Sequence, residues 1–70
     1  MDIGKKIKEA RNAAGITQIE LAERLHVYQK DISRWERGER IPSIEVFREI
    51  CIELKASADE LLELKKVKGE

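Results

Sequence analysis

The sequence has little of what would suggest disulfides, strands or a membrane segment. Cysteine, proline, tryptophan, tyrosine and phenylalanine each occur once in 70 residues. A lone cysteine excludes an internal disulfide and fits a reducing compartment. No apolar run approaches the ~20 residues of a membrane helix or resembles a signal peptide. We therefore expect one soluble, cytoplasmic, all-α domain spanning residues 1–70.

Charge is abundant but balanced, because fourteen lysine and arginine residues offset fourteen aspartate and glutamate residues. Residues 1–40 hold nine basic and seven acidic side chains, whereas residues 41–64 hold two basic and six acidic ones. The zero net charge argues weakly against a nucleic-acid partner. The short basic run after residue 64 is typical of a solvated surface.

Apolar residues recur at helical spacing almost throughout and predict a compact five-helix bundle. The first helix follows a possible cap at Asp2 and stops at Gly15. A capping box at residues 17–20 opens the second helix, and Gly38 ends the third. The apolar positions of these helices and their connections are Ile3, Ile7, Ala10, Ala14, Leu21, Ala22, Leu25, Val27, Ile32 and Trp35.

After Ile41-Pro42, Ser43 can cap a fourth helix. A second capping box at residues 57–60 predicts a fifth helix, which fades into a frayed tail at about residues 65–70. The expected core positions of these two helices are Ile44, Phe47, Ile50, Cys51, Leu54, Leu61 and Leu62, with Leu64 less well placed. Within this apolar run, the Cys51 thiol is expected to be buried and inert.

The second and third helices form a helix-turn-helix over residues 17–38. Ala22 suits a close helix crossing, and the flanking apolar residues would hold the two helices together. The exposed positions on the third helix are Gln29, Lys30, Ser33 and Arg34. Glutamine can pair with adenine, and arginine or lysine with guanine, through the edges that bases show in the major groove.

The stretch TQIELAERLHVYQKDISRWERGERIPS resembles the helix-turn-helix of the phage repressor and Cro family, also called the Xre family. The segment SIEVFREICIELKASADELLEL resembles that family's fourth and fifth helices. The resemblance implies a lambda-repressor-like DNA-binding domain and transcription regulation, typically as a repressor. It also implies sequence-specific binding to double-stranded DNA, with the third helix in the major groove of a palindromic operator and a homodimer on the DNA.

The resemblance also implies roles for individual residues. Gln18 matches a glutamine that contacts the phosphate backbone and braces the third helix, and Gln29 matches one that reads a base. The residues that match positions which vary among family members and set the preferred DNA sequence are Lys30, Ser33 and Arg34.

Further matches concern phosphate contacts and a structural pair. Arg40 matches a basic residue that often binds a DNA phosphate, and Arg37 is a candidate for a second phosphate contact. Arg11 and Glu36 match an ion pair joining the first and third helices. The alternative for that pair is an ordinary surface salt bridge worth under ~1 kcal/mol.

Two positions depart from the family pattern. His26 stands where glycine is usual, so a left-handed backbone there would be modestly strained. Tyr28 stands where serine or threonine is usual, and loss of that cap would cost roughly 1 kcal/mol. The Tyr28 ring either lies on a sugar-phosphate and donates its hydroxyl, or packs against Ile32.

The sequence offers no basis for catalysis, a metal, a cofactor or a small-molecule ligand. His26 and Cys51 are single and far apart, and no glycine-rich phosphate loop is present. Trp35 follows Ile32 on the apolar face, which favours a core role over base stacking. The main alternative function is a protein-interaction module, such as an antitoxin or regulatory subunit, that has lost DNA binding.

A homodimer needs a surface, and the fifth helix with its tail is the candidate. The residues that look apolar there but are hard to place in the core are Ile52, Leu64 and Val67.

Overall fold

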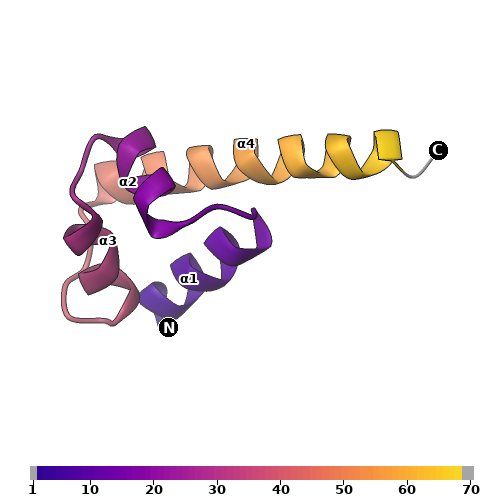
Figure 1. Ribbon diagram of the computed structural model, residues 1–70. Helices are drawn as coiled ribbons and strands as arrows, with labels where there is room; N and C mark the ends of the chain where they lie inside the picture. Colours follow the sequence, from indigo (N-terminus) through magenta and orange to yellow (C-terminus); the bar gives the residue numbers. More distant parts are fainter. Residues whose placement is uncertain (1, 69–70) are drawn as a thin grey trace.

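Four helices and their connections make up the part of the chain that the structure describes. The structure is a computed structural model that describes residues 2–68, with side chains through residue 62. The helices are α1 (Ile3–Ala13), α2 (Gln18–Leu25), α3 (Gln29–Glu36) and α4 (Ile44–Lys68) (Figure 1). These four helices lack the combination of length and apolar character that crossing a membrane requires.

The helices begin where side chains satisfy their free backbone N–H groups. The Asp2 carboxylate accepts a hydrogen bond from the Lys5 N–H at 3.0 Å, one turn into α1. The Ser43 hydroxyl accepts from the Val46 N–H at 3.2 Å, at the start of α4. Such caps replace the partners that the first helical turn lacks. Both predicted caps are confirmed.

The predicted fourth and fifth helices are one continuous helix, so the five-helix count becomes four. Ser57 does not cap a new helix but lies inside α4, where its side chain is buried. Its hydroxyl accepts a hydrogen bond from Arg24 Nη1 on α2 at 2.5 Å. No glycine or proline lies between Leu54 and Leu61, so nothing interrupts the backbone ladder there.

The helix α4 also continues to Lys68, into the stretch for which the sequence predicted a frayed tail. Leu64 and Val67, the apolar residues considered for a dimer surface, have side chains outside the described part. Ile52, the third of that set, is 57% exposed.

The core lies where α1 and α2 pack against α4 and where α3 packs against α1 and α2. Leu21, Ile32 and Ile50 are its fully buried large side chains, one from each of α2, α3 and α4. Trp35 and Val27 are half-buried and pack against the core, which confirms the core role predicted for Trp35. The other buried apolar residues are Ile7, Ala14, Ile16, Ala22, Leu25 and Leu54.

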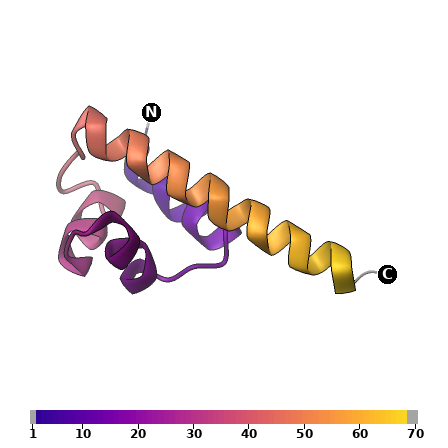
Figure 2. The ribbon, with the colours of Figure 1, turned by 90° about the horizontal axis from the view of Figure 1, so that it is seen from above.

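The helix α4 is much longer than the helices that cover it. Its 25 residues span about 37 Å, against about 16 Å for the 11 residues of α1. Figures 1 and 2 both show its C-terminal half extending past the rest of the bundle. A long stretch of α4 therefore has no helix packed on it.

Several predictions of burial are wrong. Ile44 is 86% exposed, Phe47 37% and Leu62 65%, and Cys51 is exposed as well. Leu61 is half-buried. Phe47 and Cys51 instead line an apolar groove of about 420 Å³ between α1 and α4, in which Ala10 is exposed too. Leu62 lies on the part of α4 that extends past the other helices, whereas Ile44, Phe47 and Cys51 lie in its first half, where the other helices leave part of its surface open.

Candidate nucleic-acid interface

The first helix of the interface, α2, begins with a complete capping box. The Thr17 hydroxyl accepts a hydrogen bond from the Glu20 N–H, and the Glu20 carboxylate accepts from the Thr17 N–H, both at 3.0 Å. The backbone and side-chain hydrogen bonds from Thr17 hold the pKa of Glu20 below its usual value. This box orients the end of α2 that carries Gln18, because it satisfies the first N–H groups of the helix.

The turn between α2 and α3 depends on a left-handed residue. His26 has φ 58° and ψ 42° and is the C-cap of α2. The chain can then reverse so that the Val27 N–H donates to the Ala22 carbonyl at 3.0 Å. The strained conformation expected of a non-glycine residue at this position is therefore present.

Tyr28 precedes α3 without capping it through its own side chain. The Asp31 carboxylate instead accepts a hydrogen bond from the Tyr28 N–H at 3.1 Å. The Tyr28 side chain is 74% exposed, and Lys30 Nζ lies 5.6 Å from the centre of its ring. The Tyr28 ring thus lies mostly at the surface of the interface, with the Lys30 ammonium over it.

The candidate DNA-contacting residues of α3, together with its C-cap Arg37, share one side of the helix. Residues 29, 30, 33, 34 and 37 fall within an arc of about 140° at 100° per residue. Gln29, Lys30 and Arg37 are exposed, whereas Ser33 and Arg34 are half-buried. Arg40 is exposed in the connection to α4. The structure therefore brings the five α3 positions onto one surface, with Arg40 at its end.

Arg37 is already engaged by neighbouring side chains. Its guanidinium donates to both oxygens of Glu39, at 2.7 Å from Nε and 3.2 Å from Nη2, and its Nη1 donates to the Ser33 hydroxyl. The hydrogen bond between the Arg37 and Glu39 side chains raises the pKa of Arg37 and lowers that of Glu39. Sequence reasoning missed the role of Glu39, although its place two residues after Arg37 was a usable signal.

Arg11 on α1 and Glu36 on α3 form a buried, two-pronged ion pair. Arg11 Nε and Nη2 donate to the two Glu36 oxygens at 2.7 and 3.1 Å. The side chains are 10% and 3% exposed. Arg11 Nη1 also donates to the Ile16 carbonyl at 2.9 Å. The alternative of an ordinary surface salt bridge does not fit this burial, and removing either partner would leave a buried charge.

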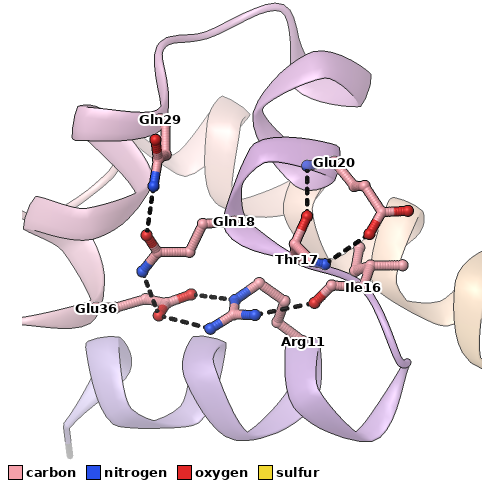
Figure 3. Close-up of polar contacts among 7 residues, drawn as sticks. All are labelled: Arg11, Ile16, Thr17, Gln18, Glu20, Gln29 and Glu36. Carbon is pink, nitrogen blue, oxygen red and sulfur yellow. Dashed lines mark hydrogen bonds and ion pairs between the residues drawn. The ribbon is translucent and has the colours of Figure 1, made fainter.

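Two glutamines extend this pair to the surface of α3. Gln18 Nε2 donates to Glu36 Oε1 at 3.0 Å, and Gln29 Nε2 donates to Gln18 Oε1 at 3.2 Å. Figure 3 shows the resulting chain of contacts from Arg11 through Glu36 and Gln18 to Gln29. Gln18 is half-buried and Gln29 exposed, so the chain runs from the core to solvent.

The described residues offer no alternative centre for metal chemistry. No group of three or more histidine, cysteine, aspartate or glutamate side chains among them could hold a metal ion. A hollow of about 400 Å³ adjoins the interface and is lined by Arg11, Gln18 and Gln29, among others. The Arg11 donors there are already bonded to Glu36 and Ile16, whereas the exposed Gln29 amide can meet a base edge.

Comparisons with known proteins agree with this geometry. A family model described as Helix-turn-helix matches residues 7–61. The chain is 39% identical over 62 residues to the HTH-type transcriptional regulator ImmR of Bacillus subtilis (strain 168), covering 89% of this chain and 49% of the relative. It is 36% identical over 62 residues to the HTH-type transcriptional activator BcrR of Enterococcus faecalis, covering 89% and 30%.

The chain thus spans about half the length of the first relative and less than a third of the second. No solved structure matches it. The family match nevertheless includes α2, the turn, α3 and most of α4. The chain belongs to the Xre-like helix-turn-helix family.

Proposed function

We propose that this chain binds double-stranded DNA in a sequence-specific manner and acts in transcription regulation. The observation that carries the proposal is the single polar surface of α3, which presents Gln29, Lys30 and Arg34 together. A helix of this kind fits the major groove, where its N-terminal residues meet the base edges. Both relatives are described as transcriptional regulators of the same type, which supports this function.

The side chains divide into base-reading and phosphate-binding groups. We assign base reading to Gln29, Lys30, Ser33 and Arg34, because they lie on the exposed side of α3. We assign phosphate contacts to Gln18 and Tyr28, which lie near the start of α3, and to Arg37 and Arg40, which follow its end. Phosphate contacts position a protein on the duplex, and base contacts supply the specificity.

Selecting bound duplexes from a random pool tests the proposal directly. We expect a preferred half-site, and a second copy of it about 34 Å away if two protein molecules bind a palindrome. Arg34→Ala and Lys30→Ala should change the preferred sequence. Arg40→Ala should weaken binding to every sequence and reduce the slope of affinity against salt by about one.

Arg48→Ala is a matched control, because Arg48 is an exposed arginine of α4 away from α3. It removes the same charge and should leave sequence preference unchanged. Absence of binding by the wild-type protein to any duplex at low salt would contradict the proposal. A protein-interaction module would then explain the fold and the zero net charge better.

Two copies of the chain are expected on the DNA. One α3 makes few contacts, and the zero net charge provides little general attraction to phosphate. An isologous pair would double the contacts on a palindromic operator. We propose that this pairing is a homodimer, and that the protein binds DNA without catalysis, metal or cofactor.

A further inference from the structure

The hydrogen-bond chain from Arg11 to Gln29 begins with two groups that have only one possible role. A guanidinium can only donate, and an ionised carboxylate can only accept. Arg11 donates to both oxygens of Glu36, which therefore remains a fixed, buried acceptor. Everything that contacts Glu36 further along must donate to it.

Gln18 is the next group, and its amide could in principle face either way. An amide has a donor end and an acceptor end. Because Glu36 only accepts, Gln18 must present Nε2 to it, as the 3.0 Å contact shows. Gln18 Oε1 then points along the chain as an acceptor, and Figure 3 shows it facing Gln29.

The same reasoning orients Gln29. Since Gln18 offers an acceptor, Gln29 must turn Nε2 toward it, and that contact is 3.2 Å long. Gln29 Oε1 and the second hydrogen on Nε2 remain unused by this chain. The exposed end of Gln29 thus carries one acceptor and one donor.

We propose that Glu36 is a positioning residue that sets the base preference of Gln29 through Gln18. In this orientation Gln29 matches adenine, which offers an N6 donor and an N7 acceptor in the major groove. Turned over, Gln29 would present two N–H donors and match guanine, which offers O6 and N7 as acceptors. The inference rests on the proposed DNA binding and specifies how it discriminates.

Gln18→Lys reverses the direction of the hydrogen bond between positions 18 and 29, and this variant tests the inference. A lysine ammonium can donate to Glu36 but cannot accept, so Gln29 would have to turn Oε1 toward it. We expect the base facing Gln29 to change from adenine to guanine. The ratio of the two affinities should shift by roughly tenfold or more, since a good bidentate contact is worth about 1–3 kcal/mol.

Two further variants separate orientation from other effects. Gln18→Met interrupts the chain without imposing a direction, so the adenine preference should fall without turning to guanine. Ile19→Lys adds the same positive charge at the neighbouring exposed position. It leaves the hydrogen bonds from Arg11 to Gln29 intact. The added charge should therefore raise the affinity for all duplexes, while adenine stays preferred.

The measurement is the set of affinities for duplexes that differ only at the base facing Gln29, with thermal melts to verify folding. Substituting Glu36 itself would leave Arg11 as a buried unpaired charge, so the Gln18 variants carry the test. An adenine preference that survives in both Gln18→Lys and Gln18→Met would overturn the inference while leaving DNA binding intact. A wild-type protein that binds no duplex would overturn the proposed function, and the inference with it.

Discussion

At the scale of single residues, the backbone of α1 lies very close to the end of α3 at Gly4. A Cβ atom at Gly4 would lie 2.2 Å from the Trp35 carbonyl oxygen and 2.9 Å from that of Glu36. Those oxygens are backbone atoms and cannot rotate away. The contact holds α1 against the same turn of α3 that carries Glu36.

Gly4→Ala should therefore lower the free energy of unfolding by about 1–3 kcal/mol, because α1 and α3 must separate to admit the methyl group. Urea denaturation measures this change. Lys8→Ala, at an exposed position of the same helix, should change stability by less than about 0.5 kcal/mol. Equal stability of Gly4→Ala and the wild type would contradict the close approach of the two helices.

A second residue-scale feature is the ion pair between Arg37 and Glu39 beside the base-reading side of α3. Glu39 occupies two of the donors that Arg37 could offer to phosphate. Both side chains are more than half exposed, so the pair is easily broken. Glu39 thus reduces the attraction of this end of α3 for DNA.

Glu39→Gln should raise the affinity for all duplexes severalfold and steepen the salt dependence, because Arg37 is released and a repelling charge is removed. In an Arg37→Gln background the gain should be clearly smaller, since only the repulsion is then relieved. Fluorescence titrations of labelled duplexes at several salt concentrations measure the affinity and its salt dependence in both backgrounds. The same gain in both backgrounds would show that Arg37 is not involved.

At the scale of elements, the capping box makes the stability of α2 depend on pH. The hydrogen bonds from Thr17 lower the pKa of Glu20 in the folded protein. A carboxyl with a lowered folded pKa contributes stability above its unfolded pKa and loses that contribution as pH falls through the folded pKa. The contribution is therefore present at neutral pH and disappears in acid.

Glu20→Gln should reduce the fall of the melting temperature as the pH drops below the ordinary glutamate pKa of about 4.3. Thr17→Ala should do the same and also cost about 1 kcal/mol at neutral pH through the lost cap. Glu23→Gln changes the charge of the same helix at an exposed position and serves as the control. If Glu23→Gln flattened the pH profile equally, general charge would explain the effect rather than the box.

The continuity of α4 is the second element-scale feature, and Ala58→Pro tests it. In a separate fifth helix capped by Ser57, Ala58 would occupy the first helical position, where proline is favourable. Inside α4, proline removes a backbone hydrogen bond and clashes with the preceding turn. We expect a loss of about 3 kcal/mol or more, measured by chemical denaturation. Asp59→Ala, at the next position of the helix, is the control. If Ala58→Pro were as stable as Asp59→Ala, α4 would not be a single continuous helix.

At the scale of the whole molecule, two features bear on assembly. The net charge is zero, and α4 is a long helix on which Ile52 and Leu62 are exposed. Exposed apolar residues on a projecting helix are compatible with pairing, although single ones are common on protein surfaces. The proposed homodimer would use such residues.

Sedimentation equilibrium over a range of protein concentrations, with and without a palindromic duplex, measures the proposed pairing. Ile52→Glu combined with Leu62→Glu should weaken dimers and lower affinity for the palindrome, but not for a single half-site. Glu49→Gln is an exposed α4 control that should alter neither. Unchanged binding of the palindrome by the double variant would place the dimer contact elsewhere.

Much of this molecule follows from the sequence because the relevant signals are local. The caps at Asp2, Thr17 and Ser43 act within one helical turn, so their residue types and spacing were enough to place three helix starts. The stop at Gly15 was likewise predictable, since its φ of +74° suits glycine. The position of the polar side of α3 follows from helical periodicity alone.

Other features depend on which surfaces meet, and only the tertiary structure decided them. Ser57 has the residue pattern of a cap, yet Arg24 of another helix takes its hydroxyl and α4 runs on. Cys51 and Phe47 have core spacing, but they line the groove between α1 and α4 and stay exposed because α1 does not close over them.

The helix-turn-helix shows the same division. The capping box placed the start of α2, and apolar spacing with the stop at Gly38 placed α3, because those signals act between near neighbours. The orientation of the Gln29 amide was decided by Glu36, which reaches it through Gln18 and is itself held by Arg11 from another helix. A direction set by contacts between three helices has no counterpart in local residue order.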